Sequence, residues 1–204
     1  MYVGRIVVIG MTQGKPFAGY RVSSRSFPNR IAAPVPEGIA IQPLDPEDMK
    51  RNPYIAYNAL RISKGGIIAT NGSHTDPIFD ALEAGASPAA ALRTVLEEMG
   101  YEKDHLNTPR IAGIIRGGKG YLGIVRDDGC DVESFDLKDG CCRIITTYEL
   151  NHFDSKEYAL DFDTADAGAR YVVDGGCFGE LELPVCSCVY FGGETAVCNP
   201  HKKD

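Results

Sequence analysis

The densest group of residues that could do chemistry lies at positions 20–30, Tyr-Arg-Val-Ser-Ser-Arg-Ser-Phe-Pro-Asn-Arg. Alternation along a strand places Arg21, Ser23 and Arg25 on one face, and a proline-containing loop could fold Arg30 back toward them. Guanidinium groups donate paired hydrogen bonds to phosphate or carboxylate oxygens. The pattern therefore favours an anion-binding site, with an exposed basic strand edge as the alternative.

A second polar group follows in residues 54–64. Strand alternation predicts Tyr57 and Arg61 on one face and Asn58 on the other, with Lys64 in the turn beyond the strand. A core strand with one buried aromatic side chain has the same pattern. The residues alone leave both interpretations open.

Two further groups stand at the ends of predicted helices. Asn71 belongs to a strand-to-helix turn, residues 69–76, that is rich in hydrogen-bonding side chains and ends in Asp76 as the expected helix cap. Glu98 and Glu102 lie at an acidic helix end. A carboxylate can act as a general base, but turn chemistry and a solvated helix end explain both groups without any ligand.

The elements that must position these side chains are mostly strands. A proline-rich stretch, residues 27–53, is expected to be largely loop because it holds six prolines. Helices are predicted to begin at Asp76-Pro77 and Ser87-Pro88 and to span 164–172. The predicted strands are 3–9, 17–23, 38–42, 54–62, 66–70, 110–115, 121–126, 131–137, 143–148, 158–162, 180–184 and 186–191. This order lacks regular βαβ alternation, so we expect one domain over 1–204 of the α+β class, with antiparallel sheets covered by helices.

Charge and composition narrow the function further. The chain of 204 residues carries a net charge of −7 and is 44% hydrophobic, with no apolar run long enough to span a membrane and no signal peptide at its start. An acidic protein is a poor general binder of nucleic acid. Residues 1–64 nevertheless hold nine Lys and Arg against four Asp and Glu. This basic segment indicates a local anionic ligand, or else attraction between the two parts of the fold.

The seven cysteines all lie between residues 130 and 198 and include no Cys-x-x-Cys pair. Cys186 and Cys188 would share one face of a strand, which is a poor zinc spacing. We expect buried thiols of a reducing compartment, with a metal site or a disulfide as the alternatives. Gly117-Gly118-Lys119-Gly120 lacks the spacing of a phosphate-binding loop and predicts a hairpin turn.

Taken in order along almost the whole chain, segments 1–10, 20–30, 54–61, 71–77, 91–101 and 116–125 resemble the archaeal IMP cyclohydrolase family. The resemblance implies a four-layer αββα sandwich of the N-terminal-nucleophile-hydrolase-like type. It also implies closure of 5-formamidoimidazole-4-carboxamide ribotide (FAICAR) to IMP and water, without metal or organic cofactor, in a cytoplasmic homotetramer. Met1-Tyr2 offers no Ser, Thr or Cys nucleophile, so the fold does not by itself imply amide hydrolysis.

The resemblance also suggests roles for the candidate residues. For a purine ribotide substrate, the expected phosphate ligands are Arg21, Ser23, Arg25 and Arg30, and the expected substrate contacts are Tyr57, Asn58 and Asn71. Lys64 is the expected stabiliser of the formyl oxygen, and Glu102 or Glu98 is the expected proton acceptor or ribose ligand. An amidohydrolase on the same fold and a non-catalytic nucleotide-binding module are the alternatives.

Overall fold

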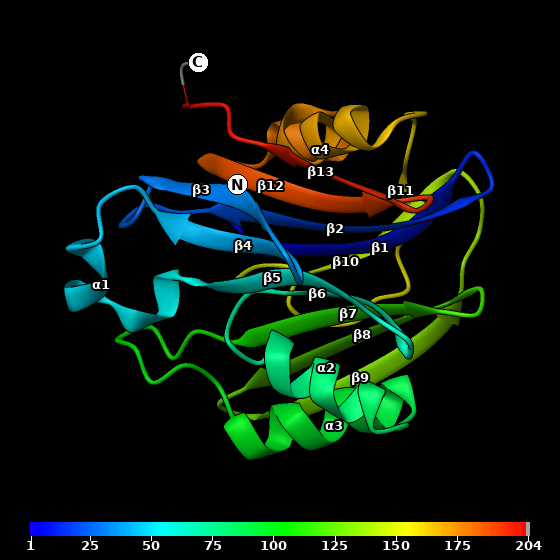
Figure 1. Ribbon diagram of the computed structural model, residues 1–204, viewed down its shortest axis with the longest axis horizontal. Coiled ribbons are helices and arrows are strands. Elements are labelled where there is room, and N and C mark those ends of the chain that lie inside the picture. The colour runs from blue at the N-terminus through cyan, green and yellow to red at the C-terminus, as the bar shows by residue number, and fades with distance from the viewer. Residues whose placement is uncertain (203–204) are drawn as a thin grey trace.

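Two antiparallel β-sheets pack face to face, and helices cover both outer faces (Figure 1). The structure is a computed structural model that describes residues 1–202. The six-stranded sheet has the order β11 (Tyr158–Ala159), β10 (Cys141–Thr146), β1 (Ile6–Thr12), β2 (Lys15–Ser23), β12 (Pro184–Phe191), β13 (Glu194–Cys198). The seven-stranded sheet has the order β3 (Arg30–Val35), β4 (Gly38–Pro43), β5 (Tyr57–Ser63), β6 (Gly66–Thr70), β7 (Arg110–Arg116), β8 (Lys119–Arg126), β9 (Gly129–Asp136).

The helices complete a helix–sheet–sheet–helix order. Helix α4 (Ala165–Asp174) lies on the six-stranded sheet, and α2 (Thr75–Glu83) and α3 (Pro88–Met99) lie on the seven-stranded sheet (Figure 1). Two short pieces, α1 (Asp48–Arg51) and the 3₁₀ turn η1 (Pro53–Ile55), precede β5, and a second 3₁₀ turn, η2 (Gly176–Glu180), precedes β12. The predicted α+β class and antiparallel sheets are therefore confirmed. Within residues 1–202, no helix is long and apolar enough to cross a membrane.

Strand β1 shows why these sequences form central strands. Its run Ile-Val-Val-Ile is apolar at every position because both faces are buried. Val7 and Ile9 enter the core between the sheets, and Ile6 and Val8 pack beneath α4. The sheets approach closely opposite Gly113, where a Cβ atom would lie 2.6 Å from Ile9.

The bulge in β5 changes which side chains share a face. The pairing with β4 shifts between Ile39 and Ala40, so Tyr57 and Leu60 both face the core between the sheets. Asn58 and Arg61 instead meet on the helix side, where both donate to the carboxylate of Asp76. The predicted common face of Tyr57 and Arg61 is therefore wrong, because the extra residue reverses the alternation.

Most of the other element predictions are confirmed, with five corrections. Residues 30–35 form a strand although they lie in the proline-rich stretch, and β13 was not predicted at all. Residues 160–162 and 180–183 are not strands. Asp76 is not the cap of α2, which starts after His74, because its carboxylate pairs with Asn58 and Arg61. The Ser87 cap and the turn at Gly117-Gly118 are as expected.

Candidate active site

A cavity of about 300 Å³ opens at one edge of the two sheets. Its walls come from both sheets, because antiparallel neighbours bring strand starts and strand ends to the same edge. From the six-stranded sheet come Arg5, just before β1, and Tyr148, just after β10. From the seven-stranded sheet come Arg30 at the start of β3, Tyr54 before β5, and Glu102 before β7.

Three arginines give the cavity its positive charge. Arg5, Arg25 and Arg30 all line it. Arg30 is buried, and its Nε donates to the carbonyl of Phe27 at 3.0 Å, which fixes the direction of the guanidinium group. Arg25 is exposed and lies 4.0 Å above the ring centre of Tyr2. Two of the residues predicted to bind an anion, Arg25 and Arg30, therefore line the same cavity, and Arg5 lines it as well.

Aromatic rings form the apolar part of the wall. Tyr2 stacks on Tyr148 with ring centres 5.8 Å apart, and Tyr54 and Phe27 contribute further ring surface. A flat heterocycle can pack against such rings. Positive charge beside flat apolar surface suits a ligand that has both a phosphate and a small planar ring.

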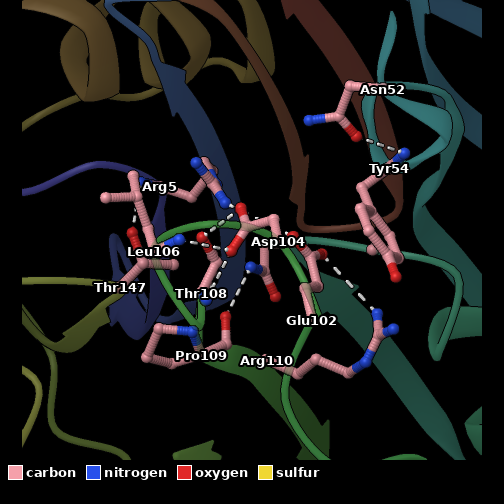
Figure 2. Close-up of polar contacts among 12 residues, drawn as sticks. Arg5, Asn52, Tyr54, Glu102, Asp104, Leu106, Thr108, Pro109, Arg110 and Thr147 are labelled. Carbon is pink, nitrogen blue, oxygen red and sulfur yellow. Dashed lines mark hydrogen bonds and ion pairs between the residues drawn. The ribbon is translucent and has the colours of Figure 1, made fainter. Parts of the chain in front are cut away.

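Glu102 is the buried acid of the cavity. Its side chain is 2% exposed, and its carboxylate oxygens lie 3.6 Å from Arg5 and 3.6 Å from Arg110. Figure 2 shows Arg110 directed at Glu102 from the start of β7. Burial raises the pKa of Glu102 to about 7, while Arg5 and Arg110 act to lower it. A carboxyl group that titrates near neutral pH is suited to accepting and returning a proton.

A compact loop between α3 and β7 holds Glu102 in place. The backbone N–H of Glu102 donates to the carbonyl of Thr108 at 2.8 Å. Within the same loop, the Asp104 carboxylate accepts from the N–H of Leu106 and from the N–H and hydroxyl of Thr108 (Figure 2). Asp104 also lines the cavity, but these bonds occupy its oxygens, so Glu102 is the carboxylate that faces a ligand.

Tyr57 lies in the core between the sheets, next to the cavity. Its hydroxyl forms a 2.6 Å hydrogen bond with that of Tyr20. Burial raises the pKa of Tyr57, and the charges on Arg30 and Arg5 oppose that rise. Burial raises the pKa of Tyr20 as well, so both hydroxyls stay protonated at neutral pH.

Arg21 and Ser23 point away from the cavity. The Arg21 guanidinium donates to the carbonyls of Val173, Phe178 and Leu181 at 2.9, 2.8 and 2.6 Å, and its Nε donates to Ser23. These carbonyls end α4 and the turn after it, where a cation is favoured. The structure thus corrects the expected phosphate role of both residues: they anchor α4 to the six-stranded sheet.

We expect Arg21→Ala to destabilise the fold and leave ligand binding intact. The carbonyls of Val173 and Leu181 would lose the guanidinium donor, at about 1–3 kcal/mol for each group left unsatisfied, while the carbonyl of Phe178 keeps the N–H of Leu181. Chemical denaturation should therefore show a lower midpoint, whereas KM for the ligand should stay within about twofold. A large rise in KM with normal stability would return Arg21 to the binding site.

Three other candidates, Asn58, Asn71 and Glu98, also lie outside the cavity. Asn58 donates to Asp76 at 2.9 Å, and Asn71 joins the end of β6 to Pro109 and Ile111 at 2.9 and 2.8 Å. Both amides serve the fold at those contacts. Glu98 is exposed in the last turn of α3, which leaves Glu102 as the acid in the cavity.

Lys64 occupies the turn between β5 and β6, where its side chain is 91% exposed and pairs with Glu83 at 3.5 Å. Strand β5 begins at the cavity and ends at this turn, roughly 20 Å away at about 3.3 Å per residue. The structure therefore separates Lys64 from the cavity. We expect Lys64→Met to keep kcat within about twofold, because an exposed pair contributes little. A steady-state assay of the variant checks this, and a tenfold loss would contradict it.

Sequence reasoning missed several residues that line the cavity, and Arg110, which pairs with Glu102 beside it. Arg5 could have been found, because the start of β1 must lie beside the end of β2 in a hairpin. Tyr148 and Arg110 could not, since their positions depend on pairings between distant strands, β1 with β10 and β6 with β7. Tyr2 and Tyr54 carry no local signal beyond being tyrosines.

The cysteines and possible metal ligands lie elsewhere. All seven cysteines are free thiols, but only Cys142, Cys186 and Cys188 are buried, so the expectation of buried thiols is confirmed in part. Cys186 and Cys188 share the core between the sheets. Within the described part of the chain, no group of three or more His, Cys, Asp or Glu side chains is arranged to hold a metal ion.

A helix–sheet–sheet–helix fold with an arginine-lined cavity and one buried carboxylate is suited to an enzyme that acts on a small anionic metabolite. The family described as IMP cyclohydrolase-like protein matches residues 2–195, and the chain belongs to this family. It is 44% identical over 188 residues to the IMP cyclohydrolase of Methanocella arvoryzae, covering 92% of this chain and 90% of that protein. It is 42% identical to that of Methanothrix thermoacetophila over 98% and 100% of the two chains, and 41% identical to that of Methanocaldococcus jannaschii over 93% of each.

Proposed function

We propose that this protein is an IMP cyclohydrolase, which closes FAICAR to IMP and water at the end of purine synthesis. The observation that carries the proposal is near-complete coverage of relatives with this name, at 40–44% identity. The cavity supports it independently, because it offers cationic groups for a phosphate, rings for an imidazole and one acid near neutral pKa.

In this reaction the carboxamide nitrogen of FAICAR attacks the formyl carbon, and the resulting carbinolamine loses water. The carboxamide nitrogen gives up one of its protons and the formamide nitrogen gives up its own, and the formyl oxygen leaves with both as water. An amide nitrogen is a weak nucleophile, so a base that takes its proton during attack lowers the barrier. Holding the two groups close and coplanar supplies much of the remaining rate enhancement.

We assign the phosphate to Arg25 and Arg30, at the edge of the cavity where Ser24 and Ser26 add hydroxyl groups. Charge-assisted bonds from a guanidinium are the strong contacts for such a group. The imidazole ring then lies against Tyr148 and Tyr54. This placement sets the reacting groups toward the buried end of the cavity.

Glu102 at that buried end is the proposed proton acceptor. After taking the carboxamide proton it becomes an acid, which can return the proton to the departing hydroxyl. Arg5, 3.6 Å from Glu102, supplies positive charge for the developing formyl oxyanion. Tyr57 contributes a hydroxyl group next to the cavity, and this hydroxyl is held by its hydrogen bond with Tyr20.

The deciding experiment mixes purified protein with FAICAR in EDTA and follows IMP by absorbance and chromatography. We expect IMP in amounts equal to the FAICAR consumed. Release of formate would favour an amidohydrolase, and binding without an absorbance change would favour a nucleotide-binding module. Either result would overturn the proposal.

We further propose that residues 1–204 form one catalytic domain of the N-terminal-nucleophile-hydrolase-like fold, acting as a cytoplasmic homotetramer without a metal or organic cofactor. The four-layer order supports the fold assignment. In the structure the Met1 amino group pairs with Glu182 at 2.8 Å and Tyr2 lines the cavity. Sedimentation at micromolar concentration tests the oligomeric state.

A further inference from the structure

Thr108 is a buried residue that joins the two sides of the cavity. Its carbonyl oxygen accepts from the backbone N–H of Glu102 at 2.8 Å. Its hydroxyl oxygen lies 2.7 Å from Oδ2 of Asp104 and 3.2 Å from the hydroxyl of Tyr148 (Figure 2). Tyr148 belongs to the six-stranded sheet, just after β10. One hydroxyl group therefore connects the loop that carries Glu102 to the opposite sheet.

The direction of each hydrogen bond follows from the groups that meet at Thr108. The Asp104 carboxylate can only accept, so it takes the single hydroxyl proton of Thr108. The oxygen of Thr108 is then an acceptor, and the hydroxyl of Tyr148 donates to it. Arg5 can only donate, so its Nη1 donates to the oxygen of Tyr148 at 3.5 Å. The four groups form a series of hydrogen bonds with one direction, which starts at the guanidinium group and ends at the carboxylate.

This series determines where the side chain of Arg5 points. With Nη1 on the hydroxyl of Tyr148, Nη2 lies 3.6 Å from the carboxylate of Glu102. The main chain of Arg5 is fixed as well, because its N–H donates to the hydroxyl of Thr147 at 3.1 Å and its carbonyl accepts from the N–H of Thr147 at 3.2 Å. The hydroxyl of Tyr148 is the contact that selects the direction of the guanidinium group.

Thr108 thus holds both members of the pair that the proposed reaction uses. Its carbonyl holds the main chain of Glu102, and its hydroxyl acts on Arg5 from the other side. We propose that Thr108 is a positioning residue for ring closure, which directs the guanidinium group of Arg5 through the hydroxyl of Tyr148. The inference rests on the proposed function, in which Arg5 supplies charge to the formyl oxyanion.

The hydroxyl of Thr108 can be separated from the rest of the loop. Without it the loop still keeps the bond from the N–H of Glu102 to the carbonyl of Thr108. Oδ1 of Asp104 still accepts from the N–H groups of Leu106 and Thr108 at 3.1 and 2.9 Å. A variant that lacks only the hydroxyl should therefore keep the loop and lose the support of Tyr148.

Thr108→Val and Thr108→Ser are the matched variants, because valine keeps the shape of threonine and serine keeps its hydroxyl. We expect Thr108→Val to lower kcat for FAICAR by about tenfold, since small misplacements in an active site are costly. KM should stay within about threefold, because the phosphate contacts are unchanged. Thr108→Ser should restore kcat to within about threefold of the wild type. Equal kcat values for the two variants would overturn the proposal, as would a loss in KM alone.

A double-variant cycle shows whether the effect passes through Tyr148. Groups that act through one contact give losses that do not multiply. In a Tyr148→Phe background, Thr108→Val should therefore change kcat by less than about twofold. A further tenfold loss would mean that Thr108 acts by another route, and the proposal would fail. If Thr108→Val does not fold, Tyr148→Phe alone must give the kcat loss, because it breaks the same series one step nearer Arg5.

Crystal structures of the wild type and Thr108→Val test the positioning without any turnover. We expect the guanidinium group of Arg5 to face Glu102 in the wild type and to turn away from it in the variant. An Arg5 side chain that keeps its direction in the variant would contradict the proposal. A wild-type protein that makes no IMP, yet shows this difference between the two structures, would refute the proposed function and leave the positioning of Arg5 by Thr108 intact.

Discussion

Glu102→Gln should lower kcat for ring closure by about 10²–10⁴-fold, the usual contribution of a positioned general base. The amide keeps the shape of the side chain but cannot accept the carboxamide proton at neutral pH. The phosphate ligands are untouched, so KM should change by less than about threefold. Steady-state assays with FAICAR give both constants.

The pH dependence of the wild-type enzyme tests the same group. Burial raises the pKa of Glu102 to about 7, and the base works in its ionised form. Values of kcat/KM should therefore be level above pH 7 and fall about tenfold per pH unit below it. The variant should lack this acid limb.

Glu98→Gln is the matched control, because Glu98 is exposed in the last turn of α3. It should keep wild-type kcat and the wild-type pH profile. Glu102→Gln removes the negative charge that pairs with Arg5 and Arg110. Circular dichroism and melting curves therefore have to show that the variant still folds. A folded Glu102→Gln enzyme with normal turnover would remove Glu102 from the chemistry.

Arg30→Ala should raise KM for FAICAR by about 10²-fold with little change in kcat. The guanidinium is 6% exposed and is oriented by the carbonyl of Phe27. A hydrogen bond to a charged group contributes about 1.5–3 kcal/mol, and each 1.4 kcal/mol corresponds to a factor of ten in affinity. A phosphate contact made equally in the ground state and transition state changes KM alone.

Two further variants separate charge from geometry. Arg30→Lys keeps the charge but not the paired donors, so its KM should fall between those of the wild type and the alanine variant. Arg116→Ala removes an exposed arginine at the far end of β7 and should leave KM unchanged. If Arg30→Ala instead lowers kcat and leaves KM as it was, its contact is not with the phosphate.

Local signals in the sequence predicted the three long helices, most strands and the α+β class, whereas the four-layer sandwich was expected only from the family resemblance. Apolar runs such as that of β1 and caps such as Ser87 depend on a few neighbouring residues. The strand at residues 30–35 escaped notice because prolines discourage a strand. It tolerates Pro34 because β3 is an edge strand with β4 on one side.

The site was harder to predict because its members meet only through distant strand pairings. Arg21 and Arg25 look equivalent in the sequence, yet the first lies within β2 under α4 and the second follows the end of β2 beside the cavity. A bulge at one position likewise moved Arg61 to the face of Asn58. The sequence showed which side chains are charged, but it did not show in which direction each of them points.

Because residues of both sheets line the cavity, binding of a ligand there is thermodynamically linked to the packing of one sheet against the other. A ligand that bridges Arg25 on one sheet and Glu102 on the other binds the assembled pair of sheets and neither alone. At a hundredfold excess over Kd such a ligand adds about 2.7 kcal/mol to the free energy of unfolding. Bound substrate or product therefore stabilises the folded protein. Hydrogen exchange of the backbone amides should then slow in both sheets together.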